Sequence, residues 1–127
     1  MSISFKLVPK KNNLVSPPQI KYYPCAVSKA TATLDDLAKV VASRSTMSKA
    51  DCYGVIISLT EAIGEALADG KIIKIDDLGT FQITLQGTPA DTQEELGKAN
   101  IKKAKIIYKP STEMKVRLKK MEFKRIR

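Results

Sequence analysis

At Gly70 the spacing of apolar residues changes from a helical period to a strand period. Between Ser48 and Gly70 the apolar residues follow one helix face, and Ala-Asp-Gly70 is typical of a helix end because glycine adopts the left-handed conformation readily. From Lys71 onward apolar and polar residues alternate, as they do in a strand with one buried face. A chain that makes this change is expected to pack helices against a small sheet, which places it in the α+β class.

Two helices are predicted upstream of Gly70. Thr33 can cap the first, and Asp35 and Asp36 in its first turn are favourable near the positive end of the helix dipole. Ser48 can cap the second, longer helix, because Asp51 follows three residues later in an approximate capping box. We expect the two helices to form a hairpin.

Three strands are predicted downstream of Gly70. The segments 71–75 and 81–86 alternate in polarity and are joined by a turn that ends at Gly79. The polar segment 87–100 has no core face, and alternation resumes at 101–109 before the next proline. We therefore expect a small sheet of three strands, with a polar segment between the second and the third.

The two ends of the chain have patterns of their own. Residues 3–8 alternate in polarity and predict a strand, and 19–23 can form a second one, in an edge hairpin or an arm. We assign 1–32 to an N-terminal extension and 33–127 to the main domain. A short last helix is expected from Ser111 or Thr112, with Met114, Leu118 and Met121 on one side and basic residues as far as Lys124 on the rest.

The charge of the chain is uneven. Lysine and arginine number 22 against 13 acidic residues, a net charge of +9. Residues 1–32 carry +5 without an acidic residue, and 101–127 carry +9, whereas the stretch between them is acidic. A basic surface beside an acidic body is typical of a polyanion binder, since each neutralised phosphate releases condensed counterions. Nucleic acid is the leading predicted partner.

The reactive side chains argue against catalysis and metal binding. Histidine is absent, so the commonest general base and imidazole ligand are missing. Cys25 and Cys52 match no zinc or redox spacing and are expected to be buried and reduced, with a disulfide as the alternative. Asp76 and Asp77 fit a turn beside Gly79 better than a carboxylate pair. We predict no enzyme activity, no catalytic residue, no cofactor, no metal ion and no small-molecule substrate.

No membrane segment is predicted either. The chain has no apolar run of the roughly 18 residues that would span a bilayer. The sequence up to Lys11 also lacks the apolar core of a secretory signal. We expect a cytoplasmic protein with no membrane partner.

A dimer is predicted from the excess of apolar positions. Two helices cannot cover both the stripe of the longer helix and one face of a sheet in a chain of 127 residues. A second copy would bury this surface, with a gain of about 25 cal/mol per Å². The expected homodimer core comprises Ile56, Leu59, Ile63, Phe81 and Ile83.

The order of these elements resembles the bacterial HU and integration host factor family of histone-like DNA-binding proteins. The matching fragments cover roughly 33–121, and the most specific is Gly-Thr-Phe81 followed about 27 residues later by Tyr-Lys-Pro110. Residues 1–32 lie outside the ordinary pattern, as in N-terminally extended relatives. The other matching fragments are Leu34-Asp35-Asp36-Leu37-Ala38, Met47 to Asp51, Ala68 to Ile75 and Met114-Lys115.

The resemblance implies a dimer that binds duplex DNA in the bacterial nucleoid, with little base reading. It implies a three-stranded antiparallel sheet with an extended β-ribbon arm at about 87–100. The arms would reach the minor groove and bend the duplex, and the sheet and helix ends would contact phosphates. Strand parity is expected to place Lys74 on the same sheet face as Lys103, Lys105 and Lys109. The start of the last helix offers open backbone amides that could hold a phosphate. The expected DNA contacts are Lys74, Lys98, Lys102, Lys103, Lys105, Lys109, Ser111, Thr112, Lys115 and Lys119, with Pro89 as a possible wedge between base pairs.

Three functions are consistent with these patterns. The first is a sequence-tolerant architectural protein that neutralises the phosphate backbone and bends or compacts duplex DNA. The second keeps the fold as a module for dimerisation and protein interaction, because Asp91, Glu94 and Glu95 lie where the family is basic. The third, RNA binding, is weaker because no exposed aromatic pair is predicted that would stack bases.

Overall fold

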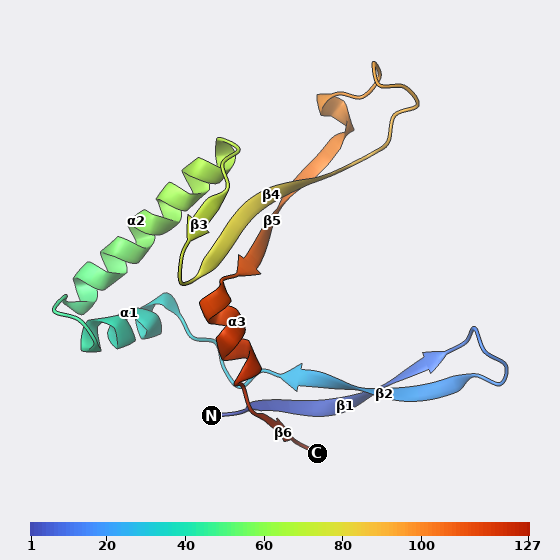
Figure 1. Ribbon diagram of the computed structural model, residues 1–127, viewed down its shortest axis with the longest axis horizontal. Helices are drawn as coiled ribbons and strands as arrows, with labels where there is room; N and C mark the ends of the chain where they lie inside the picture. Colours follow the sequence, from blue (N-terminus) through green and yellow to red (C-terminus); the bar gives the residue numbers. More distant parts are fainter. The chain divides into compact units, whose positions relative to one another are not determined.

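The computed structural model describes residues 1–127, and their contacts divide them into two compact units. The terminal unit comprises Met1–Thr33 together with Leu118–Arg127, and the central unit comprises Leu34–Arg117 (Figure 1). The last ten residues therefore group with the N-terminal segment, whereas the sequence placed them in the 33–127 domain.

The two predicted helices of the central unit are present. Helix α1 covers Leu34–Ser43 and α2 covers Lys49–Ala68, and the two are in contact. Ser48 caps α2, because its Oγ accepts a hydrogen bond from the Asp51 amide at 3.1 Å. No helix of the protein is both long and apolar enough to cross a membrane.

The end of α2 depends on Gly70, as the sequence predicted. Gly70 has a φ of +80°, in the left-handed region where a side chain would be strained. Its amide donates to the Leu67 carbonyl at 3.0 Å, and the Lys71 amide donates to the Ala66 carbonyl at 3.1 Å. These bonds satisfy carbonyls that would be unpaired at the helix end, and the chain leaves α2 as a strand.

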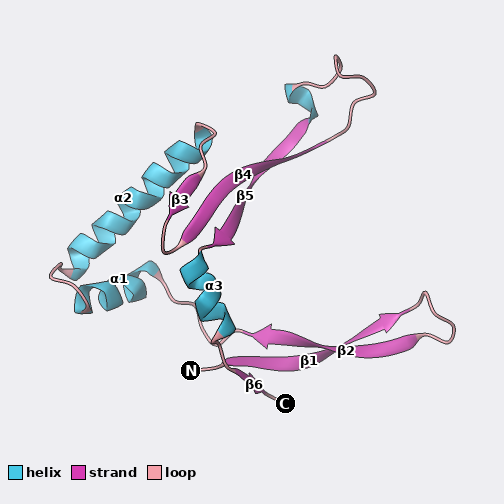
Figure 2. Cartoon of the chain, in the orientation of Figure 1, coloured by secondary structure: helices cyan, strands magenta, loops and turns pink.

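The central sheet has three antiparallel strands in the order β3, β4, β5 (Figure 2). Strand β3 covers Ile73–Ile75, β4 covers Gly79–Gly87 and β5 covers Ile101–Pro110. The strands thus follow the predicted alternation, with β3 contacting α2.

The expected β-ribbon arm over 87–100 is not formed as predicted. Pairing between β4 and β5 ends at Gly87, and the only regular element beyond it is a 3₁₀ turn, η1, at Lys98–Asn100. The Thr88 amide donates to the Asn100 carbonyl at 2.8 Å, and the Gly97 amide donates to Asn100 Oδ1 at 2.9 Å. Asn100 closes a loop at the point where a paired ribbon would continue, so the ribbon of this unit is β4 with β5.

Few side chains of the central unit are buried. Those of Ala38, Cys52 and Leu67 are 0%, 2% and 7% exposed, and they lie on the helical hairpin. Large apolar side chains on the same helices and on the sheet remain open, among them Val55 at 55% and Ile106 at 63%. One copy of this unit therefore leaves most of its apolar surface exposed.

The terminal unit is a second sheet. Strand β1, Ile3–Asn12, pairs antiparallel with β2, Gln19–Val27, so both predicted strands are present and longer than expected. Strand β6, Phe123–Arg125, adds to the other edge of β1 in parallel, which gives the order β2, β1, β6. The Ile3 amide donates to the Glu122 carbonyl and the Ile126 amide to the Phe5 carbonyl, both at 2.8 Å.

The predicted last helix is shorter than the sequence indicated. Helix α3 covers Thr112–Lys119, and the expectation that it continues past Met121 to Lys124 is wrong. The residues beyond Met121 satisfy the free backbone groups along the edge of β1 instead of forming another helical turn. That pairing also draws the end of the chain into the terminal unit.

Candidate nucleic-acid interface

The strand register of the central sheet collects polar side chains on one face. Residues directly opposite each other in neighbouring strands share a face. Thr80 of β4 lies opposite Lys74 of β3 on one side and opposite Lys109 of β5 on the other, so the three form one row across the sheet. The prediction that Lys74 shares a sheet face with Lys109 is thereby confirmed.

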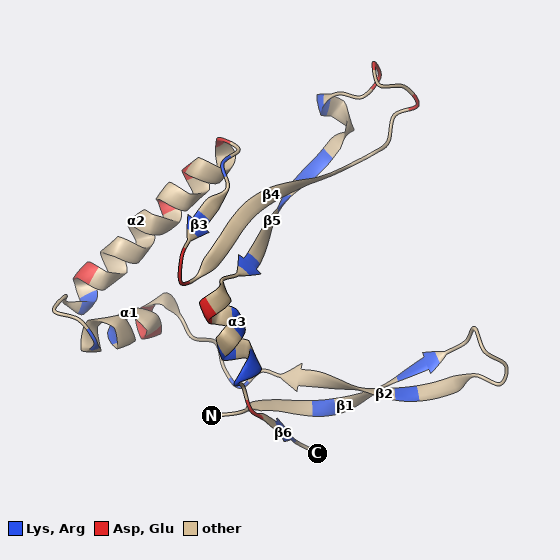
Figure 3. Cartoon of the chain, in the orientation of Figure 1, with Lys and Arg blue, Asp and Glu red and all other residues tan.

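Two further lysines continue this row along the ribbon. Lys105 lies opposite Thr84, and Lys103 lies opposite Gln86. No carboxylate occupies this face of the paired strands, and all four lysines are exposed. The blue bands on β3 and β5 mark the positions of lysines along these strands (Figure 3). We call Lys74, Lys103, Lys105 and Lys109 the central lysine face.

The polar residues of β4 belong to the same face but were not predicted as site residues. Thr80, Gln82 and Thr84 alternate with the apolar residues of this strand, and only Ile107, opposite Gln82, interrupts the polar surface. Hydroxyl and amide groups donate hydrogen bonds to phosphate oxygens without adding charge. The signal that would have found them is the same alternation that located the strand.

The other face of the sheet is apolar. The Phe81 and Tyr108 rings lie opposite each other with centroids 5.1 Å apart, and the Tyr108 hydroxyl donates to the Leu78 carbonyl at 2.8 Å. The remaining side chains of this face are those of Ile73, Ile75, Ile83, Leu85, Ala104 and Ile106. The two faces thus separate lysines from apolar side chains within a single layer.

The two most specific sequence fragments meet in this sheet. Gly79, Thr80 and Phe81 pair directly with Pro110, Lys109 and Tyr108. A Cβ at Gly79 would overlap the Lys109 carbonyl oxygen, and Gly79 has a φ of +143°, so glycine alone fits this approach. The pairing explains why the fragments occur together and places Lys109 at the root of the ribbon.

The other predicted lysines lie outside this row. Lys102 is the additional residue of a bulge, because Gly87 pairs with Ile101 while Gln86 pairs with Lys103. Lys98 is in η1, Lys115 is in α3, and Lys119 groups with the terminal unit. The register therefore brings together four of the eight predicted lysines.

The predicted open amides at the start of α3 are open only in part. The Ser111 amide donates to the Leu78 carbonyl at 3.2 Å, and the Ser111 hydroxyl donates to the Asp77 carbonyl at 2.8 Å. The same hydroxyl accepts from the Met114 amide at 3.1 Å, as a helix cap does. The expectation of an open Ser111 amide is wrong because both polar groups of Ser111 anchor the turn before β4, and the contact expected of Thr112 stays a prediction.

The loop that follows β4 is acidic, as the sequence indicated. Pro89 adjoins Thr88, whose bond to Asn100 closes the loop, so Pro89 lies at the loop's base. Asp91, Glu94 and Glu95 occupy its outer part, where the Glu95 amide donates to the Thr92 hydroxyl at 3.3 Å. The wedge role of Pro89 stays a prediction.

The five residues of the expected dimer core lie on two surfaces. Ile56 and Ile63 of α2 are half-buried, and Leu59 is 47% exposed. Phe81 and Ile83 are half-buried on the apolar face of the sheet. None of the five is fully buried within one chain.

Comparisons with known proteins give one family and one fold. A family model described as "HU domain fused to wHTH, Ig, or Glycine-rich motif" matches residues 1–125. The integration host factor subunit alpha of Caulobacter vibrioides strain NA1000 / CB15N is 28% identical over 91 residues, which cover 70% of this chain and 91% of the relative. The same subunit of Caulobacter sp. strain K31 is also 28% identical over 91 residues, with the same coverage.

A solved structure shares the fold. The crystal structure of a candidate bacterial DNA-binding protein from Bacteroides vulgatus ATCC 8482 has a TM-score of 0.72 and covers 98% of this chain at 11% identity. This chain spans about half of that solved chain, 48% of its length. At this identity the likeness extends to the fold alone.

Proposed function

The chain belongs to the family of HU domains fused to a wHTH, Ig or glycine-rich motif, and from this premise we propose that it is a sequence-tolerant architectural DNA-binding protein. It binds the phosphate backbone of duplex DNA along the minor groove and bends or compacts the duplex as a homodimer. Its place of action is the bacterial nucleoid in the cytoplasm. It catalyses no reaction and takes no small-molecule substrate or cofactor.

The observation that carries this proposal is the central lysine face. Lys74 and Lys109 flank Thr80 in one row, and Lys105 and Lys103 extend the row along β5. Four exposed ammonium groups without a carboxylate on their face repel one another, and phosphates remove that repulsion. Contacts of this kind position a protein on the duplex but read no base sequence.

The homodimer is supported by the apolar surface of the central unit. Leu59 is 47% exposed, and Leu85 and Ile106 are 61% and 63% exposed on the face opposite the lysines. Apolar surface of this extent is worth about 25 cal/mol per Å² when a second copy covers it. A two-fold pair of sheets would then expose two central lysine faces to one duplex.

A titration of a duplex of random sequence with the protein at several salt concentrations tests the proposal. Each phosphate contact contributes about 0.9 to the slope of log affinity against log salt. We expect steep salt dependence for the unaltered protein. The variant K103Q/K105Q/K109Q is expected to lower that slope by about 2 to 3 and to weaken binding.

A matched variant, K39Q/R44Q/K71Q, removes the same charge from α1, from the turn that follows it and from the segment after α2. Lys39 and Lys71 form only exposed ion pairs, with Asp35 at 3.8 Å and Asp69 at 3.4 Å, so their loss costs little stability. We expect this control to keep the slope of the unaltered protein. Binding that is absent or insensitive to salt would reject the proposed function.

The acidic loop favours a second candidate function, that of a dimeric module that binds a protein partner. Asp91, Glu94 and Glu95 would repel phosphates at the end of the ribbon. Charge reversal at Lys103, Lys105 and Lys109 separates the two functions in cells. Loss of DNA retention supports the architectural protein, whereas unchanged retention supports the protein-interaction module.

A further inference from the structure

We propose that the terminal unit is a second surface for duplex DNA, separate from the central lysine face. The inference rests on the proposed function only in that it assumes the same ligand, duplex DNA. The terminal unit contains ten lysine and arginine side chains and one carboxylate, that of Glu122, whereas the central unit contains twelve of each sign. The whole net charge of +9 therefore resides in the terminal unit.

The register of the sheet places four of these charges on one face, whereas Lys11 and Arg125 lie on the other. Lys10 of β1 lies directly opposite Lys21 of β2, and Lys6 lies opposite Cys25. Lys124 of β6 lies beside Ser4, so it shares the face of Lys6 and Lys10. We call Lys6, Lys10, Lys21 and Lys124 the terminal lysine face; in Figure 3 strands β1 and β2 show blue bands and no red.

This arrangement does not serve the stability of the sheet. Like charges directly opposite each other in an antiparallel pair are destabilising, and no acidic residue is present in 1–33 to compensate Lys10 and Lys21. The Lys10 ammonium lies 5.2 Å from the centre of the Tyr23 ring, a contact that supports the side chain without neutralising it. A bound polyanion would relieve the repulsion between these lysines, so the arrangement favours polyanion binding.

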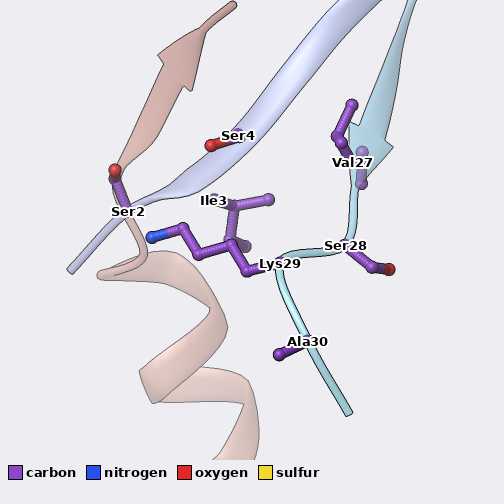
Figure 4. A pocket seen from close by; sticks show the side chains of 8 residues that line it. Ser2, Ile3, Ser4, Val27, Ser28, Lys29 and Ala30 are labelled. Atoms are coloured by element: carbon purple, nitrogen blue, oxygen red, sulfur yellow. The ribbon is translucent and has the colours of Figure 1, made fainter.

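Hydrogen-bond donors continue this surface at the root of the hairpin. A depression of about 310 Å³ is lined there by Ser2, Ser4, Ser28 and Lys29 together with the apolar residues Ile3, Ala26, Val27 and Ala30 (Figure 4). Ser4 shares the face of Lys124, so the depression adjoins the terminal lysine face. Its charged group is the Lys29 ammonium and its hydroxyls belong to serines, a set of groups that suits a phosphate oxygen.

The spacing of the lysines fits a duplex backbone. Lys6 and Lys10 are four residues apart on one strand, which corresponds to about 13 Å at the rise of a β-strand. Lys10 and Lys21 are separated by one interstrand distance, about 5 Å. A two-stranded ribbon can lie along a groove of the duplex, with flexible lysine side chains reaching phosphates on either side. The predicted contacts are therefore to the backbone, without base reading.

Cys25 gives a direct test in the unaltered protein. Its thiol is exposed beside Lys6 on the terminal lysine face, so the expectation that Cys25 is buried is wrong. Cys52 is buried as expected, at 2% exposed, and serves as an internal control. We would measure the rate at which a maleimide modifies Cys25 with and without saturating duplex DNA at low salt. At least a fivefold slower modification is expected with DNA. An unchanged rate under conditions where the duplex is fully bound would overturn the inference.

A charge variant gives the second readout. In the full chain, K6Q/K10Q/K21Q is expected to lower the slope of log affinity against log salt by about 2 to 3, while K39Q/R44Q/K71Q leaves it unchanged. Combining K6Q/K10Q/K21Q with K103Q/K105Q/K109Q should lower the slope by the sum of the two effects. A slope for K6Q/K10Q/K21Q equal to that of the control would overturn the inference, including the case in which the face binds an acidic protein.

The two proposals can fail separately. If K103Q/K105Q/K109Q loses affinity while K6Q/K10Q/K21Q and Cys25 show no effect, the terminal surface is refuted and the proposed function stands. If K6Q/K10Q/K21Q and Cys25 respond while K103Q/K105Q/K109Q binds like the unaltered protein, the terminal surface stands and the central lysine face is refuted as the site.

Discussion

The two antiparallel ribbons of this protein, β4 with β5 and β1 with β2, have similar faces and different ends. Each has most of its lysines on one face. The opposite face of the central ribbon is apolar, whereas apolar residues occur on both faces of the terminal ribbon, where Val8 and Tyr23 lie beside the lysines. The loop after β4 carries Asp91, Glu94 and Glu95, whereas the loop between β1 and β2 has no charge and exposes Leu14 to 97%. The central ribbon thus ends in a group that repels DNA, and the terminal ribbon ends in one that does not.

The two units also differ in net charge. The central unit has the family's paired fragments, Gly79 to Phe81 against Tyr108 to Pro110, but no net charge. The terminal unit, which the matched family model also covers except for the last two residues, carries the net charge of +9. Affinity for a polyanion is therefore expected to depend on both units, and the following variants test that comparison.

The largest effect is expected at the root of the central ribbon. In Gly79→Ala the new Cβ would overlap the Lys109 carbonyl oxygen and come within 2.8 Å of Tyr108 Cε1, at a φ of +143°. We expect the free energy of unfolding of the central unit to fall by about 3 kcal/mol, measured by urea denaturation followed through the helical signal.

Gly64→Ala is the matched control for that variant. Gly64 lies inside α2, and a Cβ there meets nothing within 4 Å, so alanine is expected to stabilise the helix by about 0.5 to 1 kcal/mol. If Gly79→Ala and Gly64→Ala changed the stability in the same direction, the close approach at Gly79 would not be what fixes the central ribbon.

A smaller effect is expected at the acidic loop. Replacing Glu94 and Glu95 by glutamine removes two negative charges from the end of the central ribbon, and we expect duplex affinity to rise about threefold at roughly 0.1 M salt. The pair Glu61→Gln and Glu65→Gln removes the same charge from the exposed side of α2. Equal gains in both variants would show that only net charge matters, and a loss of affinity at Glu94 and Glu95 would show that the loop assists binding.

The smallest effect on affinity is expected at the two ribbon ends. Leu14 is almost fully exposed at the end of the terminal ribbon, and apolar side chains of this kind are used to wedge base steps apart. We expect Leu14→Ser to reduce the bend of the duplex, measured by energy transfer between its ends, with at most about a twofold change in affinity. Pro89→Ala is the counterpart at the central loop. A larger change in bend in Pro89→Ala than in Leu14→Ser would show that Pro89, and not Leu14, is the wedge.

Parts of the fold with local causes were predicted well. The cap at Ser48, the stop at Gly70 and the alternation of β4 each depend on a few neighbouring residues, and the structure confirms all three. Parity also placed Lys74 on the face of Lys109, because the side-chain period of a strand is two. Strand alternation was therefore sufficient to group four of the predicted DNA contacts.

Other parts could not be predicted because their partners are distant in the sequence. Basic residues after Met121 fit a helical pattern, yet Phe123–Arg125 pair with Ile3–Phe5 at the opposite end of the chain. Ser111 has the composition of an open helix start, but its amide and hydroxyl bond to Leu78 and Asp77. Asn100 likewise closes the loop at Thr88 instead of extending a ribbon.

The sequence alone determined where both helices of the hairpin and five of the six strands form, which strand positions are polar and how the charge is distributed along the chain. These properties follow from the period of each element and from the capping residues, which act over a few positions. Only the tertiary structure decided that the two ends of the chain form one sheet and that the net charge gathers there. Which remote strands form backbone hydrogen bonds with each other depends on which strand edges are unpaired, and no short stretch of sequence indicates this.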